Sequence, residues 1–220
     1  MTTSRRHFSI LIILTSLCWA YNYACGAVAI TEPGNARAAS AGTMGTFGYQ
    51  FVVGPQSLSV AALGIWDSDE DGLVMAHQLA LWDASGALLG STTIPAGTST
   101  TKIGEFRYQL LLAPIVLTAG ETFTIGSSYV TADPDLLRTA VPPGPTFSAD
   151  IQFPASRYFL GQFAFPTDSV GGSPYAGPNF QYVVVPEPSS ICVLILGIVA
   201  FIKVRTSAAK LPYHQRIGKD

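Results

Sequence analysis

The densest group of chemically active side chains in this sequence is an acidic run, DSDEDG, at residues 67–72. Carboxylates at alternate positions followed by glycine are typical of the first half of a calcium-binding loop. Gln78 stands where an EF-hand carries its bidentate glutamate, and the following residues predict a strand rather than a helix. The EF-hand is therefore excluded. A looser calcium site on Asp67, Asp69 and Asp71 remains, beside the alternative of a solvated acidic turn.

His77 is the one histidine between the two ends of the chain, and no cysteine lies there. A serine–histidine–aspartate triad would have to use it, and a site of several histidine ligands cannot form within one chain. No G-x-S-x-G elbow and no phosphate-binding glycine loop is present. We therefore expect no enzymatic activity, with a small secreted hydrolase as the catalytic alternative. Because Leu79 and Leu81 share its strand face, His77 is expected as a hydrogen-bonded core residue.

Trp82 falls on the opposite face of the same strand, together with Gln78. An exposed tryptophan can stack on a sugar ring, whereas packing under a neighbouring loop is the commoner arrangement. The main alternative function is therefore a carbohydrate-binding module that uses Trp82 or the loop residue Tyr175. Calcium at the acidic run would order such a module.

The composition favours strands and turns. Of 220 residues 21 are glycine and 15 are proline, and charged residues make up 12%, about half the share usual in soluble domains. Between residues 27 and 185 there are 12 acidic and 5 basic residues. This balance excludes a highly charged disordered chain and argues against a nucleic-acid partner.

Alternation of apolar and polar residues predicts half-buried strands. They are expected at 47–53, 58–66, 77–82, 87–94, 105–110, 122–125, 159–165 and 180–185. Turn residues predict hairpins at 83–86 and 118–121, and surface loops at 133–154 and 171–178. We expect an all-β fold: one antiparallel β-sandwich, jelly-roll-like, over residues 30–185. An N-terminal signal helix and a C-terminal transmembrane helix would flank it.

The N-terminus has the layout of an export signal. Arg5 and Arg6 precede an apolar stretch at 8–20, and small residues follow at 27–29. This is the order of a cleaved signal peptide, and the apolar stretch is short for a membrane span. We expect residues 1–29 to be removed, so that the mature chain starts at Ile30.

Several details of this export remain open. Cleavage after Gly26 or Ala27 also fits the small residues. SRRHF at residues 4–8 matches the core of a twin-arginine signal, while two ordinary arginines fit the general secretion route. A lipid-modified Cys25 is a further alternative, although Asn22 stands where such a signal needs an apolar residue.

The C-terminus carries a second apolar segment. Residues 191–202 are uncharged, and as a helix they rise about 18 Å, short of a ~30 Å hydrocarbon core. The tripeptide Pro186, Glu187 and Pro188 precedes this segment, and Lys203 and Arg205 close it. The basic tail at 206–220 is expected on the cytoplasmic side.

This order of features is similar to the PEP-CTERM protein-sorting domain, with Pro186, Glu187 and Pro188 at the positions of its tripeptide. Residues 186–205 would form the sorting signal. The resemblance implies a membrane processing enzyme, exosortase, that recognises the region and removes the anchor. Members are exported in bacteria with an outer membrane, often alongside exopolysaccharide genes. The basic stop here is looser than the arginine run of the family, and 15 residues follow it.

Residues 47–129 also resemble ectodomains that precede such tails. The resemblance rests on LGIWD at 63–67, DGL at 71–73, His77 and LW at 81–82. It implies a β-sandwich without an established activity. We therefore expect an exported surface or extracellular-matrix protein, structural or adhesive in an exopolysaccharide context, with a membrane-anchored precursor.

Overall fold

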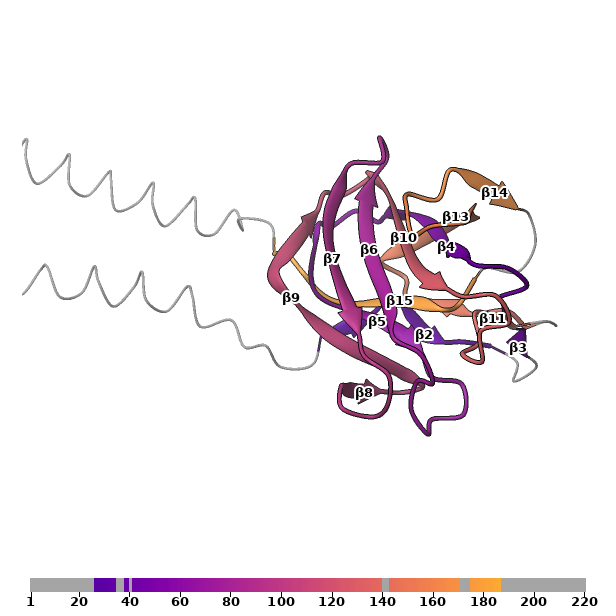
Figure 1. Cartoon of the computed structure of the whole chain (residues 1–220). Helices are drawn as coiled ribbons and strands as arrows, with labels where there is room; N and C mark the ends of the chain where they lie inside the picture. The colour runs from indigo at the N-terminus through magenta and orange to yellow at the C-terminus, as the bar shows by residue number, and fades with distance from the viewer. Residues whose placement is uncertain (1–25, 35–37, 40, 140–142, 171–174, 187–220) are drawn as a thin grey trace, which may run out of the picture.

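A computed structural model describes residues 26–34, 38–39, 41–139, 143–170 and 175–186 (Figure 1). In these residues the chain is all-β, with fifteen strands and no helix. The strands are β1 (Ala27–Val28), β2 (Ile30–Glu32), β3 (Ala38–Ala39), β4 (Gly45–Val53), β5 (Leu58–Trp66), β6 (His77–Asp83), β7 (Leu88–Ile94), β8 (Thr101–Ile103), β9 (Phe106–Leu117), β10 (Thr122–Tyr129), β11 (Arg138–Thr139), β12 (Thr146–Phe147), β13 (Ile151–Leu160), β14 (Asp168–Val170) and β15 (Pro178–Val184).

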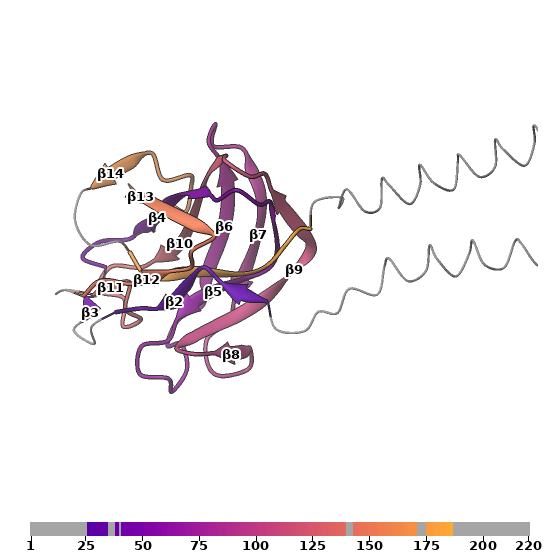
Figure 2. The same ribbon diagram turned by 180° about the vertical axis from the view of Figure 1, so that it is seen from behind.

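The strands form two larger sheets and two small ones. The five-stranded sheet has the order β1-β15-β5-β9-β8, and the six-stranded sheet has the order β14-β13-β4-β10-β6-β7. Two-stranded sheets pair β11 with β3 and β12 with β2. Within the described ranges every strand pairing is antiparallel. Figure 2 shows the same arrangement from behind.

Apolar side chains of both larger sheets share one core. Phe51 of β4 and Phe180 of β15 belong to different sheets, and their ring centroids lie 5.0 Å apart. Tyr49, Ile65 and Tyr182 are each 0% exposed in the same core. The alternation that predicted these strands therefore reflects burial of one strand face between two sheets.

Most of the predicted strands and one of the two predicted hairpins are confirmed. At residues 83–86, β6 turns directly into its neighbour β7, with Gly86 at φ 85° and Asp83 Oδ1 accepting the Ser85 and Ala87 N–H groups. The second hairpin prediction is wrong. Residues 118–121 join β9 of the five-stranded sheet to β10 of the six-stranded sheet, so this turn connects the two sheets and does not form a hairpin.

The predicted loop at 133–154 and strand at 159–165 also need correction. Strand β13 begins at Ile151 and ends at Leu160, and Phe163 and Phe165 lie in the loop that follows it. The pairing of β13 with β4 shifts register between Gln152 and Ala155. Pro154 falls within this bulge, which is where a strand tolerates a residue without an N–H group. Proline in the sequence therefore concealed a strand.

Gly48 of β4 pairs with Gly126 of β10, at a position where the two central strands leave no room for a side chain. A Cβ atom at residue 48 would lie 1.9 Å from the carbonyl oxygen of Ile125. Backbone on both sides cannot retreat within a paired sheet, so Gly48→Ala is expected to lower the free energy of unfolding by about 3 kcal/mol. Urea unfolding of both proteins measures the difference.

Gly42→Ala is the matched control, because a Cβ atom at residue 42 would meet nothing within 4 Å. We expect it to change the free energy of unfolding by less than about 0.5 kcal/mol. A Gly48→Ala variant as stable as the Gly42→Ala variant would contradict the described contact between β4 and β10.

The expected terminal signals fall mainly outside the described residues. These are the signal helix, Glu187, Pro188, the transmembrane helix with Lys203 and Arg205, and the tail at 206–220; of the tripeptide only Pro186 is described. In the part of the chain that the structure covers, no helix is both long and apolar enough to span a bilayer.

Candidate functional sites

The acidic run begins where β5 ends, and its first carboxylate is part of a buried ion pair. Asp67 is 2% exposed, and its Oδ2 accepts a hydrogen bond from Arg107 Nε at 2.6 Å. Arg107 lies on β9, pairs in register with Ile65 of β5, and is 4% exposed. Oδ1 of Asp67 accepts the N–H of Gly72 at 3.4 Å. The first side chain of the run therefore closes its own loop and joins it to β9.

The remaining acidic residues of the run are exposed. Glu70 has φ 64° and forms an ion pair with Lys102, which lies on β8. One oxygen of each of Asp67, Asp69 and Asp71 lies within 4.8 Å of the others, which is compatible with one ion. However, a calcium ion at Asp67 would have to share that carboxylate with the Arg107 guanidinium. The geometry therefore fits a turn in which two of the four carboxylates are paired with basic side chains better than a calcium site.

Removal of calcium tests this interpretation. We expect the unfolding temperature to be the same in EDTA and in millimolar calcium, because Arg107 already holds the Asp67 carboxylate that the ion would need. A site filled at about 100 times its dissociation constant would instead add about 2.7 kcal/mol to the free energy of unfolding. A rise in unfolding temperature with calcium that is lost in Asp71→Asn would restore the calcium site.

His77 is the centre of a second buried group. It begins β6, is 1% exposed, and its Nε2 lies 2.9 Å from Asp135 Oδ2 and 4.0 Å from Asp133 Oδ1. Its Nδ1 lies 2.6 Å from the carbonyl oxygen of Ser128, and its ring centroid lies 4.9 Å from that of Tyr129. The prediction of a buried, hydrogen-bonded histidine is thus confirmed.

Both ring nitrogens of His77 face acceptors, which favours the doubly protonated ring. A carbonyl oxygen and an ionised carboxylate have no hydrogen to offer, so each contact needs an N–H from the imidazole. Burial lowers the pKa of His77, but the hydrogen bonds to Asp135 and Ser128 and the charge of Asp133 outweigh it and leave the pKa raised. We infer an imidazolium at the start of β6, held by Ser128 of β10 and by Asp135 of the loop that follows β10.

The composition of this group, one histidine and two carboxylates, also matches a metal ligand set. Its hydrogen bonds favour another role. Asp135 accepts the N–H groups of Val74 and Met75 at 3.0 and 2.9 Å. Asp133 accepts the N–H of Val130 at 2.8 Å. Since His77 Nε2 already faces Asp135, the group serves to tie the loop before β6 to the loop after β10.

The proposed glycan-stacking role of Trp82 needs correction. Its side chain is 5% exposed, and Phe163 and Phe165 lie on it with ring centroids 5.8 and 5.9 Å away. A covered ring cannot stack on a sugar, and the alternative of packing under a neighbouring loop is the one observed. Tyr175 also has an aromatic neighbour, because its ring lies edge-on to Phe47 at 5.5 Å.

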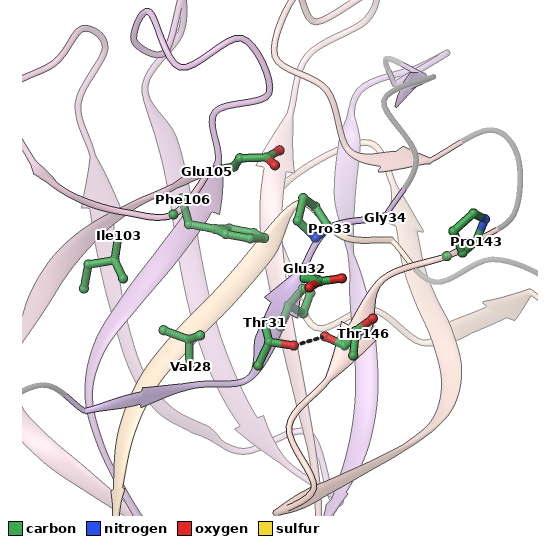
Figure 3. Close-up of a pocket in the computed structure, with 13 residues that line it drawn as sticks. Val28, Thr31, Glu32, Pro33, Gly34, Ile103, Glu105, Phe106, Pro143 and Thr146 are labelled. Atoms are coloured by element: carbon green, nitrogen blue, oxygen red, sulfur yellow. Dashed lines mark hydrogen bonds between the residues drawn. The ribbon is translucent and has the colours of Figure 1, made fainter.

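A cleft of about 740 Å³ lies between β2, the turn before β9 and residues 143–146 (Figure 3). The ring of Phe106 forms part of its wall together with Ile103 and Val28. Glu32 and Glu105 supply carboxylates at the cleft. Oε2 of Glu105 accepts the indole N–H of Trp66 at 2.9 Å, which fixes this side chain at the end of β5. The volume lies within the range of small-molecule sites.

The sequence patterns did not predict Arg107, Asp133, Asp135 or this cleft as parts of sites. Arg107 alternates with apolar residues and was expected on a solvated strand face, but the acidic loop covers it. Asp133 and Asp135 stood in a predicted surface loop. Two sequence features could have indicated these residues. One is Arg107, a rare basic residue in an acidic region, and the other is the D-P-D sequence at 133–135.

No protein-family model, no curated protein and no solved structure matches this chain. The sites above therefore stand on their own geometry.

Proposed function

We propose that this chain is an exported, non-catalytic surface or extracellular-matrix protein whose body is a jelly-roll-like β-sandwich. One observation carries the proposal. The first and last strands of the described body are neighbours, with Ala27 opposite Tyr182 and the Ala29 N–H donating to the Phe180 carbonyl at 3.0 Å. The two ends of the described body therefore lie at one edge of it, which suits a folded head carried on a tether.

Two further features support a head that binds or supports rather than catalyses. The buried ionisable side chains form structural pairs, Asp67 with Arg107 and His77 with Asp135. The sandwich interpretation rests on the two larger sheets, which share one core and between which the chain passes several times. Sorting by a PEP-CTERM signal, with an exosortase-type enzyme as partner, rests on the sequence resemblance at residues 186–205.

Strand β1 bears on the site of signal cleavage. Ala29 is 0% exposed, and its carbonyl accepts the Ser148 N–H at 2.8 Å. Cleavage before Ile30 would remove β1 and these bonds. We therefore expect the mature chain to begin at Ala27 or before it, as the alternative of cleavage after Gly26 would give. N-terminal sequencing of the exported protein measures this, and a chain starting at Ile30 would contradict it.

Replacement of Glu187 tests the sorting proposal in the native host. Glu187→Ala is expected to leave the full-length chain in the membrane fraction, while the parent chain is shortened and released. Ser207→Ala, in the tail that follows the sorting signal, is the control and should be processed like the parent. If Glu187→Ala is processed as fast as the control, the tripeptide is not a sorting signal.

The cleft favours carbohydrate binding as a second candidate function. It combines the half-buried apolar side chains of Val28 and Ile103 with carboxylates at Glu32 and Glu105, which can accept hydrogen bonds from sugar hydroxyl groups. The test is binding of exopolysaccharide fragments from the host. We expect Glu32→Gln to weaken binding at least tenfold, or about 1.4 kcal/mol. Glu121→Gln, an exposed residue away from the cleft, is the control. Equal binding by both variants would remove the cleft as a glycan site.

A further inference from the structure

Exposed large apolar side chains gather on two strands. On β7 these are Leu88 and Leu89, exposed by 59% and 37%, and on β9 they are Leu110, Leu112 and Val116, exposed by 68%, 109% and 62%. We call these five residues the β7–β9 face. Contiguous exposed apolar surface on a soluble domain commonly marks a place of interaction.

The two strands that carry the β7–β9 face pack against each other. A Cβ atom at Gly90 of β7 would lie 2.6 Å from Ile115 Cδ1 of β9, a partly buried side chain that lies between the exposed ones in sequence. No acidic or basic residue occurs at 84–101 or at 108–120. Each charged side chain that enters a lipid interface costs free energy, so a surface without charges is suited to lie against lipid.

Strand register places the Val116 end of this face where the chain leaves the body. Val116 of β9 and Val183 of β15 both pair with Ser59 of β5, so they lie level on either side of it. Leu110 pairs with Ala62 and Ile115 pairs with Val60, so residues 111–114 of β9 form a bulge that has no partner on β5. Val183 is itself 44% exposed. In both views β9 curves around the side on which β15 ends, with β7 beside it (Figures 1 and 2).

The length of chain between the body and the apolar segment is short. The described body ends at Pro186, and the uncharged run starts at Ile191. Five residues span at most about 17 Å when fully extended. If residues 191–202 are inserted in a bilayer, the end of β15 therefore lies close to its surface.

We propose that the β7–β9 face lies against the lipid surface while the chain is anchored, with Leu112 of the β9 bulge and the preceding Leu110 in the interface. This inference rests on the anchored precursor proposed above. It gives the short apolar segment a second point of attachment, since leucine side chains in the interface add to the apolar area that the membrane buries. It also gives the folded head a fixed orientation, with the loop before β6 directed away from the membrane.

A second copy of the chain is the competing occupant, because β7 is an edge strand of its sheet. Three observations favour lipid: the absence of charge, the register with β15 and the short connection to the apolar run. A surface for self-association would need neither the absence of charge nor a position at the anchored end of the body.

The test uses the full chain in phosphatidylethanolamine–phosphatidylglycerol vesicles, with Cys18, Cys25 and Cys192 replaced by serine. An environment-sensitive fluorophore is attached at Leu112→Cys or at Val74→Cys. Both side chains are exposed, and Val74 is an apolar residue at 59% exposure at the opposite end of the strands. We expect the fluorophore at residue 112 to shift its emission to the blue and to lose most of it to a lipid-borne quencher. The fluorophore at residue 74 should show neither effect.

Three results would overturn the inference, and they are distinguishable. If the chain resists carbonate extraction but the fluorophore at residue 112 stays in water, the anchor is supported and the lipid contact is refuted. If carbonate extracts the chain, both the anchor and the lipid contact are refuted. Protection of residue 112 that depends on protein concentration, and persists in detergent without vesicles, assigns the face to a second copy.

Discussion

Asp67→Asn is expected to lower the free energy of unfolding by about 3–5 kcal/mol, because it leaves the Arg107 guanidinium buried without its counter-charge. For a body of this size such a loss lowers the unfolding temperature by roughly 10 °C. Asp67 and Arg107 are 2% and 4% exposed, and their 2.6 Å bond joins the acidic loop to β9. Thermal unfolding followed by circular dichroism measures the change.

Two controls separate the pair from the general acidity of the loop. Asp69→Asn removes an exposed carboxylate two residues away and should change the free energy of unfolding by less than about 0.5 kcal/mol. The double variant Asp67→Leu, Arg107→Met removes both charges and should recover most of the loss. If Asp67→Asn and Asp69→Asn unfold at the same temperature, the described ion pair does not form.

Raising the pH is expected to weaken the fold through His77. The pKa of His77 in the folded protein lies above its ordinary value of 6.5, since the hydrogen bonds to Asp135 and Ser128 and the charge of Asp133 outweigh burial. The stabilisation is therefore fully present below pH 6.5 and is lost as the pH rises through the raised pKa. The Tyr129 ring, which packs on His77, adds no charge in this range.

Asp135 limits the same stabilisation at low pH. Burial raises its pKa, but the hydrogen bond from His77 and those from the Val74 and Met75 N–H groups leave it below the ordinary value of 3.8. Its contribution is present above pH 3.8 and is lost as the pH falls through the lowered pKa. The pair therefore stabilises the fold most between pH 3.8 and pH 6.5.

Asp135→Asn isolates this contribution. It leaves a buried histidine without its carboxylate, so we expect a loss of about 3 kcal/mol near pH 6 and a smaller loss at high pH, where the His77 charge is already gone. Unfolding temperatures across the pH range of both proteins measure it. A parent unfolding temperature that rises with pH above 6.5, or a His77 ring that titrates below 6.5 by NMR, would contradict the imidazolium.

The alternation of apolar residues was sufficient to predict the strands that bury one face, such as β4, β5 and β6. It failed where chain segments far apart in sequence decide the environment. Arg107 looked solvated until the acidic loop was placed over it, and Trp82 is covered by Phe163 and Phe165, which the pattern had assigned to a strand. The register of distant segments determines such contacts, and local periodicity carries no information about it.

The same reason explains which parts of the candidate sites were visible in the sequence. The acidic run and His77 stand out by residue type alone. Their partners do not: Asp135 lies 58 residues from His77, and Arg107 lies 40 residues from Asp67. Placing the partners identified the acceptors that surround the expected core histidine, and it showed that the first carboxylate of the acidic run belongs to a buried ion pair.

The intact mass and terminal sequences of the protein from its native envelope and medium test the central proposal most directly. We predict a chain that begins at Ala27 or before it and ends within residues 186–190, with the folded body released. A chain that still ends at Asp220 in every fraction would contradict sorting and release, and would leave the protein as a permanently anchored one.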